Sequence, residues 1–392
     1  MQLGQGTGPL SGVRVVEIAG IGPGPHGCQI LADLGADVVR VERPGGGALG
    51  GGPDDLTTRG RPSVALDLKR PEAVQTVLRL VETADVLVEG MRPGVTERLG
   101  LGPDDCLARN PRLVYARMTG WGQTGPLAEA AGHDITYIAT AGALFGLGQD
   151  PARPHFPMNL LGDFGGGSTY LVIGILAALL EARSSGRGQV VDAAIVDGVA
   201  HLQTMFYGQA VAGAHHPDRR ASGLLDGGIP FYDVYATSDG RHVAVGPLEG
   251  KFYADFCQRL APYLGGRTMP GQYDLARFAE MRSTLADTFA TRSMAEWADV
   301  FEGTDACVAP VLTLTEAARH PHLAARGTLV EHEGVLQPAP APRFSRTPAT
   351  LGAPPAAAPG AHTREALAAW GIDDVDTLLA DGVAVASDVA SK

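Results

Sequence analysis

The feature that most constrains the fold is a regular alternation of short β-branched segments with helical patterns in the N-terminal half of the chain. Strands separated by helices form βαβ units, and such units build a mostly parallel sheet with helices on its faces. The predicted fold class is therefore α/β. The strands are expected at residues 13–18, 37–42, 63–68, 85–89, 112–117 and 189–195.

Two longer helical patterns cover residues 133–145 and 167–183. Further along the chain the pattern changes. Strands expected at 230–236 and 242–246 flank the Ser-Asp-Gly sequence at 238–240, which is a turn of the kind that closes a hairpin. Helices follow this hairpin, so we expect a smaller α+β domain in this region.

A chain of 392 residues exceeds what one hydrophobic core usually organises, so two domains are expected. One helix of the smaller domain starts at the capping box formed by Ser293 and Glu296. Residues 335–361 are rich in Pro and Ala, which is typical of an extended linker, and a last helix is expected near 363–370. The expected division is a large α/β domain at 1–220, a small α+β domain at 226–330, and a linker with a C-terminal segment at 331–392.

Composition and charge narrow the class of ligand. The chain is 45% hydrophobic and 19% charged, as ordinary globular proteins are. Its formal net charge is −12, which argues against nucleic acid as a partner because phosphate backbones need a basic surface. Any anionic ligand must therefore be held by a local group of Arg and Lys.

The cysteines and the apolar segments indicate the cellular compartment. The four cysteines are far apart and form no CxxC pair, which suits a reduced cytoplasm better than a disulfide framework or a zinc site. No signal peptide is recognised at the N-terminus. The most apolar stretch, 170–180, is shorter than the ~20 residues that span a bilayer. We expect a cytoplasmic protein with no membrane partner and no bound metal.

A Gly-rich turn at residues 20–25 follows the first strand and opens a helix, as a dinucleotide-binding turn does. Pro23 and Pro25 have no N–H to offer a pyrophosphate, and the third glycine of GxGxxG is missing. A plain tight turn is the better interpretation. The Gly-rich segment 45–52 is either a surface loop or a mobile loop that closes over a ligand.

Arginines follow two of the predicted strands. Arg43 comes just after the second strand and Arg92 just after the fourth, with Arg59, Arg61 and Arg98 nearby in sequence. Ligands of parallel α/β sheets bind at these strand ends. A guanidinium matches phosphate oxygens, so the joint pattern favours a phosphate-bearing ligand, although a solvated charge explains any one of these residues equally well.

Two residues are candidates for acid/base chemistry. His133 starts an apolar helix within Ala-Gly-His-Asp, and Asp163 precedes Phe-Gly-Gly-Gly and the most apolar helix. A single Asp at this position is by default an N-cap, and Asp134 is explained as a helix-start residue. The three glycines after Asp163 favour a site, because they expose backbone N–H groups that can hold developing negative charge.

Several long motifs in the expected order resemble the family III CoA-transferase superfamily, from about residue 9 through the C-terminal region. Within that superfamily the sequence is most similar to the α-methylacyl-CoA racemases. The motifs are PLSGVRVVEIAG at 9–20, LADLGADVVRVERP at 31–44, GHD at 132–134, GDFGGG at 162–167, GRGQVVDA at 186–193, DGGIPFY at 226–232 and EGTDACV at 302–308.

The resemblance implies a doubly wound large domain built from the N-terminal part and the returning C-terminus. It also implies an inserted smaller domain and two chains interlocked as a homodimer. The substrate would be an acyl-CoA, bound near Arg43, Ala65 and Arg92, with Arg98 as a further contact. No cofactor is implied beyond the CoA of the substrate.

The resemblance also implies roles for the two candidate groups. Racemases of the superfamily use an aspartate at the position of Asp163 and a histidine at that of His133, and a residue matching Glu249 lies near the site from the other subunit. The implied activity is a cofactor-independent isomerisation of 2-methylacyl-CoA in lipid and fatty acid metabolism. The alternative is a family III CoA-transferase, in which Asp163 attacks the thioester and forms an acyl anhydride.

Inversion of the α-carbon needs a base on one face and an acid on the other, with an enolate between them. The backbone N–H groups of residues 163–166 are expected to stabilise the enolate oxygen. A carboxylic acid that donates a proton near pH 7 needs a raised pKa, so a fairly dry site is expected around Asp163.

Overall fold

The computed structural model describes residues 6–47, 50–150 and 152–387. The chain divides into two compact units, each of which has its own core. The first unit comprises Met1–Ala141, Pro157–Leu202 and Gly327–Lys392, and the second comprises Gly142–Phe156 and Gln203–Arg326.

The division departs from the expected one at 220, because residues from 203 onward group with the second unit. Helix α9, Thr204–Val211, carries no buried residue, so no side chain of it is anchored in the core of the first unit. The short segment Gly142–Phe156 also belongs to the second unit, which the sequence did not indicate.

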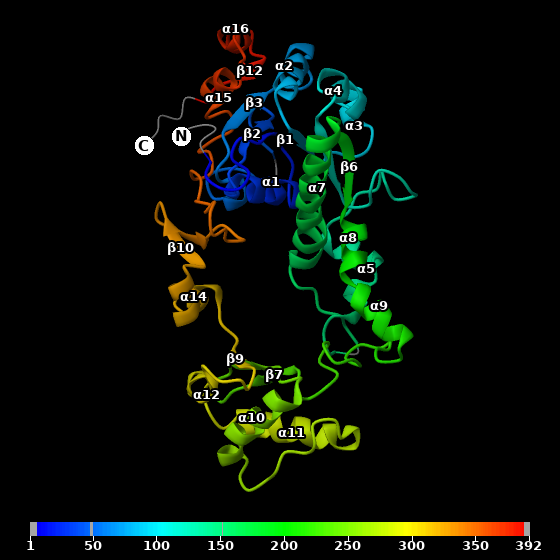
Figure 1. Ribbon diagram of the computed structural model, residues 1–392, viewed down its shortest axis with the longest axis vertical. Coiled ribbons are helices and arrows are strands. Elements are labelled where there is room, and N and C mark those ends of the chain that lie inside the picture. The colour runs from blue at the N-terminus through cyan, green and yellow to red at the C-terminus, as the bar shows by residue number, and fades with distance from the viewer. Residues whose placement is uncertain (1–5, 48–49, 151, 388–392) are drawn as a thin grey trace. The chain divides into compact units, whose positions relative to one another are not determined.

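The first unit is built on a seven-stranded sheet with the order β12-β3-β2-β1-β4-β5-β6 (Figure 1). Neighbouring strands are parallel throughout, except that β12 pairs with β3 in the antiparallel direction. The order around β1 reverses between β2 and β4, as in doubly wound folds, which confirms the predicted α/β class. The strands are β1 Arg14–Ile18, β2 Asp37–Glu42, β3 Ser63–Leu66, β4 Val86–Glu89, β5 Val114–Thr119, β6 Gln189–Ala194 and β12 Ala384–Val385.

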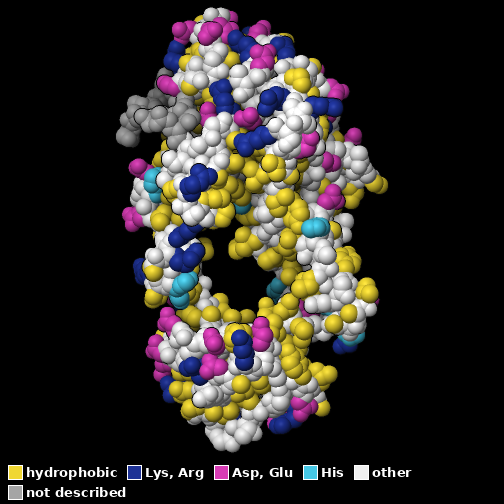
Figure 2. All heavy atoms as spheres, in the orientation of Figure 1, with side chains coloured by type: hydrophobic (Ala, Val, Ile, Leu, Met, Phe, Trp, Pro, Cys, Tyr) yellow, Lys and Arg dark blue, Asp and Glu magenta, His cyan; other side chains and the backbone are white. Residues whose placement is uncertain are grey.

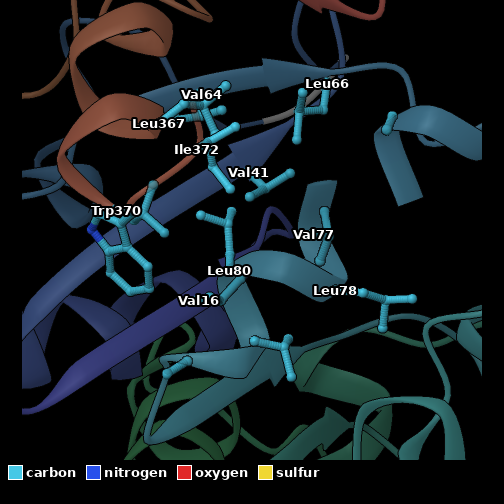
Figure 3. Packing of buried hydrophobic residues seen from close by; sticks show 14 of the residues in the cluster. Val16, Val41, Val64, Leu66, Val77, Leu78, Leu80, Leu367, Trp370 and Ile372 are labelled. Atoms are coloured by element: carbon cyan, nitrogen blue, oxygen red, sulfur yellow. The ribbon is translucent and has the colours of Figure 1, made fainter. Parts of the chain in front are cut away.

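The core of this unit lies between the sheet and the helices that cover it. Figure 3 shows Val16, Val41 and Val64 of the strands packed with Leu80 of α2 and with Trp370, which follows α15. The C-terminal segment therefore completes the sheet layer of the first unit. The helices of the unit are α1 Pro23–Asp33, α2 Pro71–Glu82, α3 Val95–Leu99, α4 Pro103–Arg109, α5 Asp134–Thr140, α7 Thr169–Ser185, α8 Ile195–Leu202, α15 Thr363–Ala369 and α16 Val375–Ala380, with the 3-10 turn η1 Leu56–Thr58.

Two expected elements differ in the structure. The helix expected at 133–145 is broken, because Gly142 adopts a left-handed backbone with φ 82° and α6, Ala143–Gly146, begins after it. The supposed linker begins with a strand, since β11 Val335–Pro338 pairs with β10 Leu329–His332 as a hairpin.

The helix expected at 167–183 is longer than its sequence pattern indicated. A π-helix, η2 Leu160–Ser168, runs directly into α7, and the combined segment Leu160–Ser185 has 26 residues. By length and composition alone it could cross a bilayer, so the argument from the short stretch 170–180 was wrong. Within the unit, α7 packs against β5, β6 and α1.

The second unit contains a three-stranded antiparallel sheet of β7 Asp233–Ala236, β8 His242–Val245 and β9 Val308–Pro310. An aromatic cluster that includes Phe256, Phe289 and Trp297 fills its core. The predicted hairpin and the capping box at Ser293 are both confirmed. Its further helices are α10 Gly250–Leu260, η3 Ala261–Tyr263, η4 Leu275–Arg277, α11 Phe278–Phe289, α12 Met294–Phe301, α13 Leu314–Ala317 and α14 Pro321–Arg326.

Candidate active site

Asp163 lies inside the π-helix η2 rather than at the N-cap that its sequence context suggested. π-helical turns of this kind occur often at functional sites, because they project one residue out of the regular helical register. The side chain is half-buried, and the amide Nδ2 of Asn159 donates to Asp163 Oδ2 at 3.2 Å. Asn159 lies four residues earlier, which places it one turn away.

The glycines after Asp163 have a packing role that differs from the expected one. A side chain on Gly166 would collide with Val199 of α8, and one on Gly167 would crowd Pro23 of α1. The glycines therefore let two neighbouring helices approach η2 closely. The N–H of Asp163 itself donates to Asp134 Oδ2 at 2.7 Å, so the expectation that this N–H is free to hold an enolate oxygen was wrong.

Asp134 is the buried neighbour of Asp163. It is the first residue of α5, it is 7% exposed, and no hydrogen-bond partner for its Oδ1 is found within the described part of the chain. Its position at the start of α5 agrees with the interpretation of Asp134 as a helix-start residue. Its contact with the Asp163 backbone adds a second function, which is to tie α5 to the π-helix.

The surroundings of Asp163 raise its pKa above the ordinary value. Burial is the main cause, and the negative charge of Asp134 acts in the same direction. The hydrogen bond from Asn159 and the positive charge of His133 act in the opposite direction. The net shift is the one that a proton-donating carboxylic acid requires.

His133 is the N-cap residue of α5, and its side chain is exposed. The N–H of His133 donates to Thr136 Oγ1 at 3.0 Å, which fixes the start of the helix. Asp134, the residue after His133, accepts the N–H of Asp163, so the start of α5 that carries His133 lies beside the π-helix that carries Asp163. Glu249 belongs to the second unit, where it precedes α10 and is exposed.

Tyr137 was missed by sequence reasoning. It lies four residues after His133 on the same face of α5, and its ring packs edge-on against Trp121 with 4.8 Å between centroids. Its ring also fills the space beside Gly120, where any side chain would overlap it. Burial raises the pKa of Tyr137, the charge of Asp163 raises it further, and the charge of Arg92 lowers it. Tyr137 therefore lies close enough to Asp163 and Arg92 for their charges to affect its pKa.

Of the residues predicted to bind or lie near the phosphates of a ligand, some are exposed and others are buried. Arg43 and Arg92 are exposed directly after β2 and β4, as expected, and Arg43 Nε donates to the carbonyl oxygen of Gly46. Arg98 lines a cavity of about 620 Å³ together with Lys69. Ala65 is fully buried on β3, and its N–H donates to Thr363 Oγ1 at 3.0 Å, so that backbone donor is already used.

Arg59 and Arg61 do not belong to an exposed phosphate site. Arg59 is 2% exposed and pairs with Asp33, while Arg61 is 1% exposed and pairs with Glu17 at 2.5 Å. Arg40 pairs with the same carboxylate of Glu17. Arg40 on β2 and Arg61 before β3 both bind Glu17 of β1, and the Arg59–Asp33 pair joins the end of η1 to the end of α1, so the role of these pairs is structural.

The Gly-rich turn after β1 approaches the site. Gly22 adopts a positive φ of 67°, and a side chain there would lie 3.3 Å from Asp163 Oδ2. Glycine at this position therefore permits the close approach of the turn to the carboxylate. Within the described ranges, no group of three or more His, Cys, Asp or Glu side chains gathers as a metal site requires.

Comparisons with known proteins agree over nearly the whole chain. The profile of CoA-transferase family III matches residues 10–363. Alpha-methylacyl-CoA racemase of Mus musculus is 44% identical over 370 residues, which cover 94% of this chain and 95% of the relative. The racemase of the same name from Homo sapiens is 41% identical over 368 residues, covering 92% and 93% of the two chains.

Solved structures with the same fold include a CAIB/BAIF family protein from Brucella suis, with a TM-score of 0.79 at 26% identity over 93% of this chain and 100% of that chain. Rv3272 from M. tuberculosis has a TM-score of 0.73 at 28% identity over 92% of this chain and 99% of that chain.

Proposed function

The chain belongs to CoA-transferase family III, and from this premise we propose that it is a racemase that interconverts (2R)- and (2S)-2-methylacyl-CoA thioesters. Two relatives that match over more than nine-tenths of this chain carry the name alpha-methylacyl-CoA racemase. The observation that carries the proposal is the contact of Asp134, the residue after the exposed His133, with the backbone of Asp163, a half-buried residue whose pKa is raised.

The reaction moves one proton. The thioester acidifies the α-carbon, because the electron pair left by the proton delocalises onto the carbonyl oxygen. A neutral His133 takes the proton from one face, and a protonated Asp163 returns a proton to the other face; the reverse pair acts on the opposite epimer. General acid/base help of this kind contributes roughly 10²–10⁴-fold per group. The proposed reaction uses no cofactor besides the CoA of the substrate.

CoA transfer is the second candidate, and the family profile supports it. In that reaction Asp163 would attack the thioester carbonyl as a nucleophile, releasing the CoA thiolate and forming an acyl anhydride. A nucleophilic carboxylate must be ionised. Burial and the charge of Asp134 both favour the protonated form of Asp163, which the racemase uses with one of the two epimers and which the nucleophilic attack never uses.

The CoA part of the substrate is assigned to the arginines after β2 and β4. Arg43 and Arg92 are exposed after β2 and β4, the two strands that flank β1, at the carboxyl edge of the sheet where ligands of this fold class bind. Arg98 and Ala65 are the further proposed contacts, although the N–H of Ala65 is already bound to Thr363. We also propose that two copies of the chain form an interlocked homodimer. In this dimer, Glu249 of one copy lies near the active site of the other. The proposed location is the cytoplasm.

Exposed apolar side chains support the homodimer. On the first unit, Ile173 and Leu180 of α7 are 55% and 70% exposed. On the second unit, Tyr207 and Val211 of α9 are 63% and 92% exposed. Figure 2 shows hydrophobic side chains gathered on the surface over these helices. Sedimentation velocity at micromolar concentration should give twice the monomer mass, and a monomer at that concentration would refute the assignment.

The reaction is tested with one epimer of a 2-methylacyl-CoA in D₂O, without a carboxylic acid acceptor. NMR follows deuterium entry at the α-carbon and formation of the other epimer. Both signals are expected, with inversion lost in Asp163→Asn and His133→Ala. Absence of exchange, followed by transfer of CoA when a carboxylate is added, would establish the transferase instead.

A further inference from the structure

His26, in the N-terminal turn of α1, makes two contacts with the π-helix that carries Asp163. The ring of His26 stacks on the ring of Phe164, with centroids 4.2 Å apart and planes 30° apart. His26 Nδ1 also lies 2.7 Å from Ser168 Oγ, at the end of the π-helix. One side chain of α1 therefore touches η2 on both sides of its glycine run.

The hydrogen bonds around Ser168 link His26 to the carbonyl of Phe164. The hydroxyl of Ser168 donates to the carbonyl oxygen of Phe164 at 3.0 Å, and a hydroxyl has one proton to give. In the arrangement in which Ser168 donates to Phe164, His26 donates from Nδ1 to Ser168 Oγ. The resulting chain runs from the imidazole through the hydroxyl to the carbonyl of Phe164, whose ring the same imidazole covers.

The packing around this chain leaves little room for a different arrangement. A side chain on Gly27 would lie 2.9 Å from Leu171 Cδ2, and one on Gly167 would lie 3.1 Å from Pro23 Cβ. Ser168 is fully buried. Four residues before His26, Gly22 faces the carboxylate of Asp163 itself. The N-terminal turn of α1 and the π-helix are therefore in close contact.

We propose that His26 is a positioning residue for Asp163, acting through the Ser168 hydroxyl and the Phe164 ring to fix the π-helical turn that aims the carboxylic acid at one face of the substrate. This inference rests on the proposed racemase function. His26 does not touch the reacting atoms in this scheme. It restricts the turn from which Asp163 projects, and Asp163 is the group whose placement must be accurate to a fraction of an ångström.

The electrostatic surroundings favour the neutral form of His26. Burial is the main cause that lowers its pKa; the charge of Asp33 acts against this, and the charges of Arg59 and Arg61 lower the pKa further. These are the charged groups that affect the ring. The hydrogen bond to Ser168 does not depend on this shift, because a proton on Nδ1 is present both in the imidazolium and in one neutral tautomer.

The test distinguishes proton exchange that needs His133 alone from inversion, which also needs Asp163. Each epimer is incubated alone in D₂O, and NMR measures exchange with retention and inversion as separate rates. The epimer whose α-proton faces His133 can exchange with retention through His133 alone, because this exposed group renews its proton from solvent. Inversion in either direction needs Asp163 as well.

His26→Phe keeps a ring on Phe164 and removes the hydrogen bond, and Ser168→Ala removes the same bond from the other side. In both variants inversion should fall by about 10- to 100-fold, the range for a misplacement of up to about 1 Å. Retention exchange through His133 should stay within about threefold of its wild-type rate. His26→Asn, which offers an N–H near the position of Nδ1, should recover most of the inversion.

A role in folding alone gives a different result. It would lower exchange and inversion by the same factor in each variant, together with the melting temperature, and this outcome would overturn the inference. Unchanged inversion in Ser168→Ala would overturn it as well. Gln29→Ala, on the same helix and hydrogen-bonded to Asp33, is the matched control and should leave both rates unchanged. Wild-type protein without any exchange would instead refute the proposed function.

Discussion

Replacement of Gly162 by alanine is expected to inactivate the site, because the added methyl group displaces the carboxylate of Asp134. A methyl group on Gly162 would lie 2.3 Å from Asp134 Oδ2, the oxygen that accepts the N–H of Asp163. Gly162 does not have a positive φ, so the new residue fits the backbone. The collision with the carboxylate of Asp134 is therefore the main effect of the substitution.

The size of the effect follows from the geometry. Non-bonded atoms need a separation of about 3.5 Å, so the carboxylate must retreat by about 1 Å. The hydrogen bond to Asp163, at 2.7 Å, is then broken. Hydrogen bonds to charged groups contribute about 1.5–3 kcal/mol. If that contribution is lost in the transition state, kcat/KM falls by about 10- to 150-fold. Stability changes less, because alanine is better than glycine in a helix by about 0.5–1 kcal/mol.

The assay measures racemisation of a 2-methylacyl-CoA by NMR beside urea unfolding of the same preparation. Gly24→Ala is the control, since no heavy atom lies within 4 Å of its added methyl group. A Gly162→Ala enzyme with more than half of the wild-type kcat/KM would refute the argument that the Asp134–Asp163 contact is needed. Equal losses in both variants would show that the effect is not specific to that contact.

Three further outcomes are expected. Arg43→Ala should raise KM for the CoA ester by about 10-fold or more with little change in kcat, as the loss of a charged hydrogen bond implies; an unchanged KM in steady-state kinetics would remove Arg43 from the CoA site. Glu17→Gln should lower the free energy of unfolding by about 3–5 kcal/mol in urea titrations, because it leaves Arg40 and Arg61 buried without their counter-charge; a loss below about 1 kcal/mol would contradict this. Because the folded-state pKa of Asp163 is raised, its ionisation destabilises the fold, so Asp163→Asn should be more stable than wild type at pH 7, and the difference should vanish below the unfolded pKa of about 3.9.

The sheet was predicted well because buried parallel strands are nearly continuous apolar runs. The strand expected at 37–42 is β2, Asp37–Glu42, and the one expected at 13–18 is β1, Arg14–Ile18. The two-residue strand β12 was not predicted, since so short a segment carries no periodicity. The break at Gly142 was also missed, because a single glycine within a helical pattern is compatible with either a continuous or a broken helix.

For the site, the sequence indicated His133 and Asp163 but not how they are held. A π-helix differs from an α-helix in closing its hydrogen bonds one residue later, so the pattern of 160–168 does not distinguish them. Asn159 and Tyr137 lie four residues from the two candidates, and helical spacing was the signal that could have found them. The contact between Asp134 and the Asp163 backbone joins residues 29 positions apart, and it depends on how α5 packs against η2.

The same contact bears on which reaction the fold performs. Burying one carboxylate beside another is unfavourable for the ionised forms, because like charges at short range in a partly dry site repel each other. A protein that used Asp163 as an anhydride-forming nucleophile would gain from relieving that repulsion, since the attacking form is ionised. A racemase needs Asp163 protonated with one epimer and ionised with the other, and the raised pKa makes the protonated form more available. Asp134 also cannot move away without releasing the Asp163 N–H. The arrangement therefore links the position of Asp163 to its tendency to hold a proton, and that link serves a racemase better than a transferase.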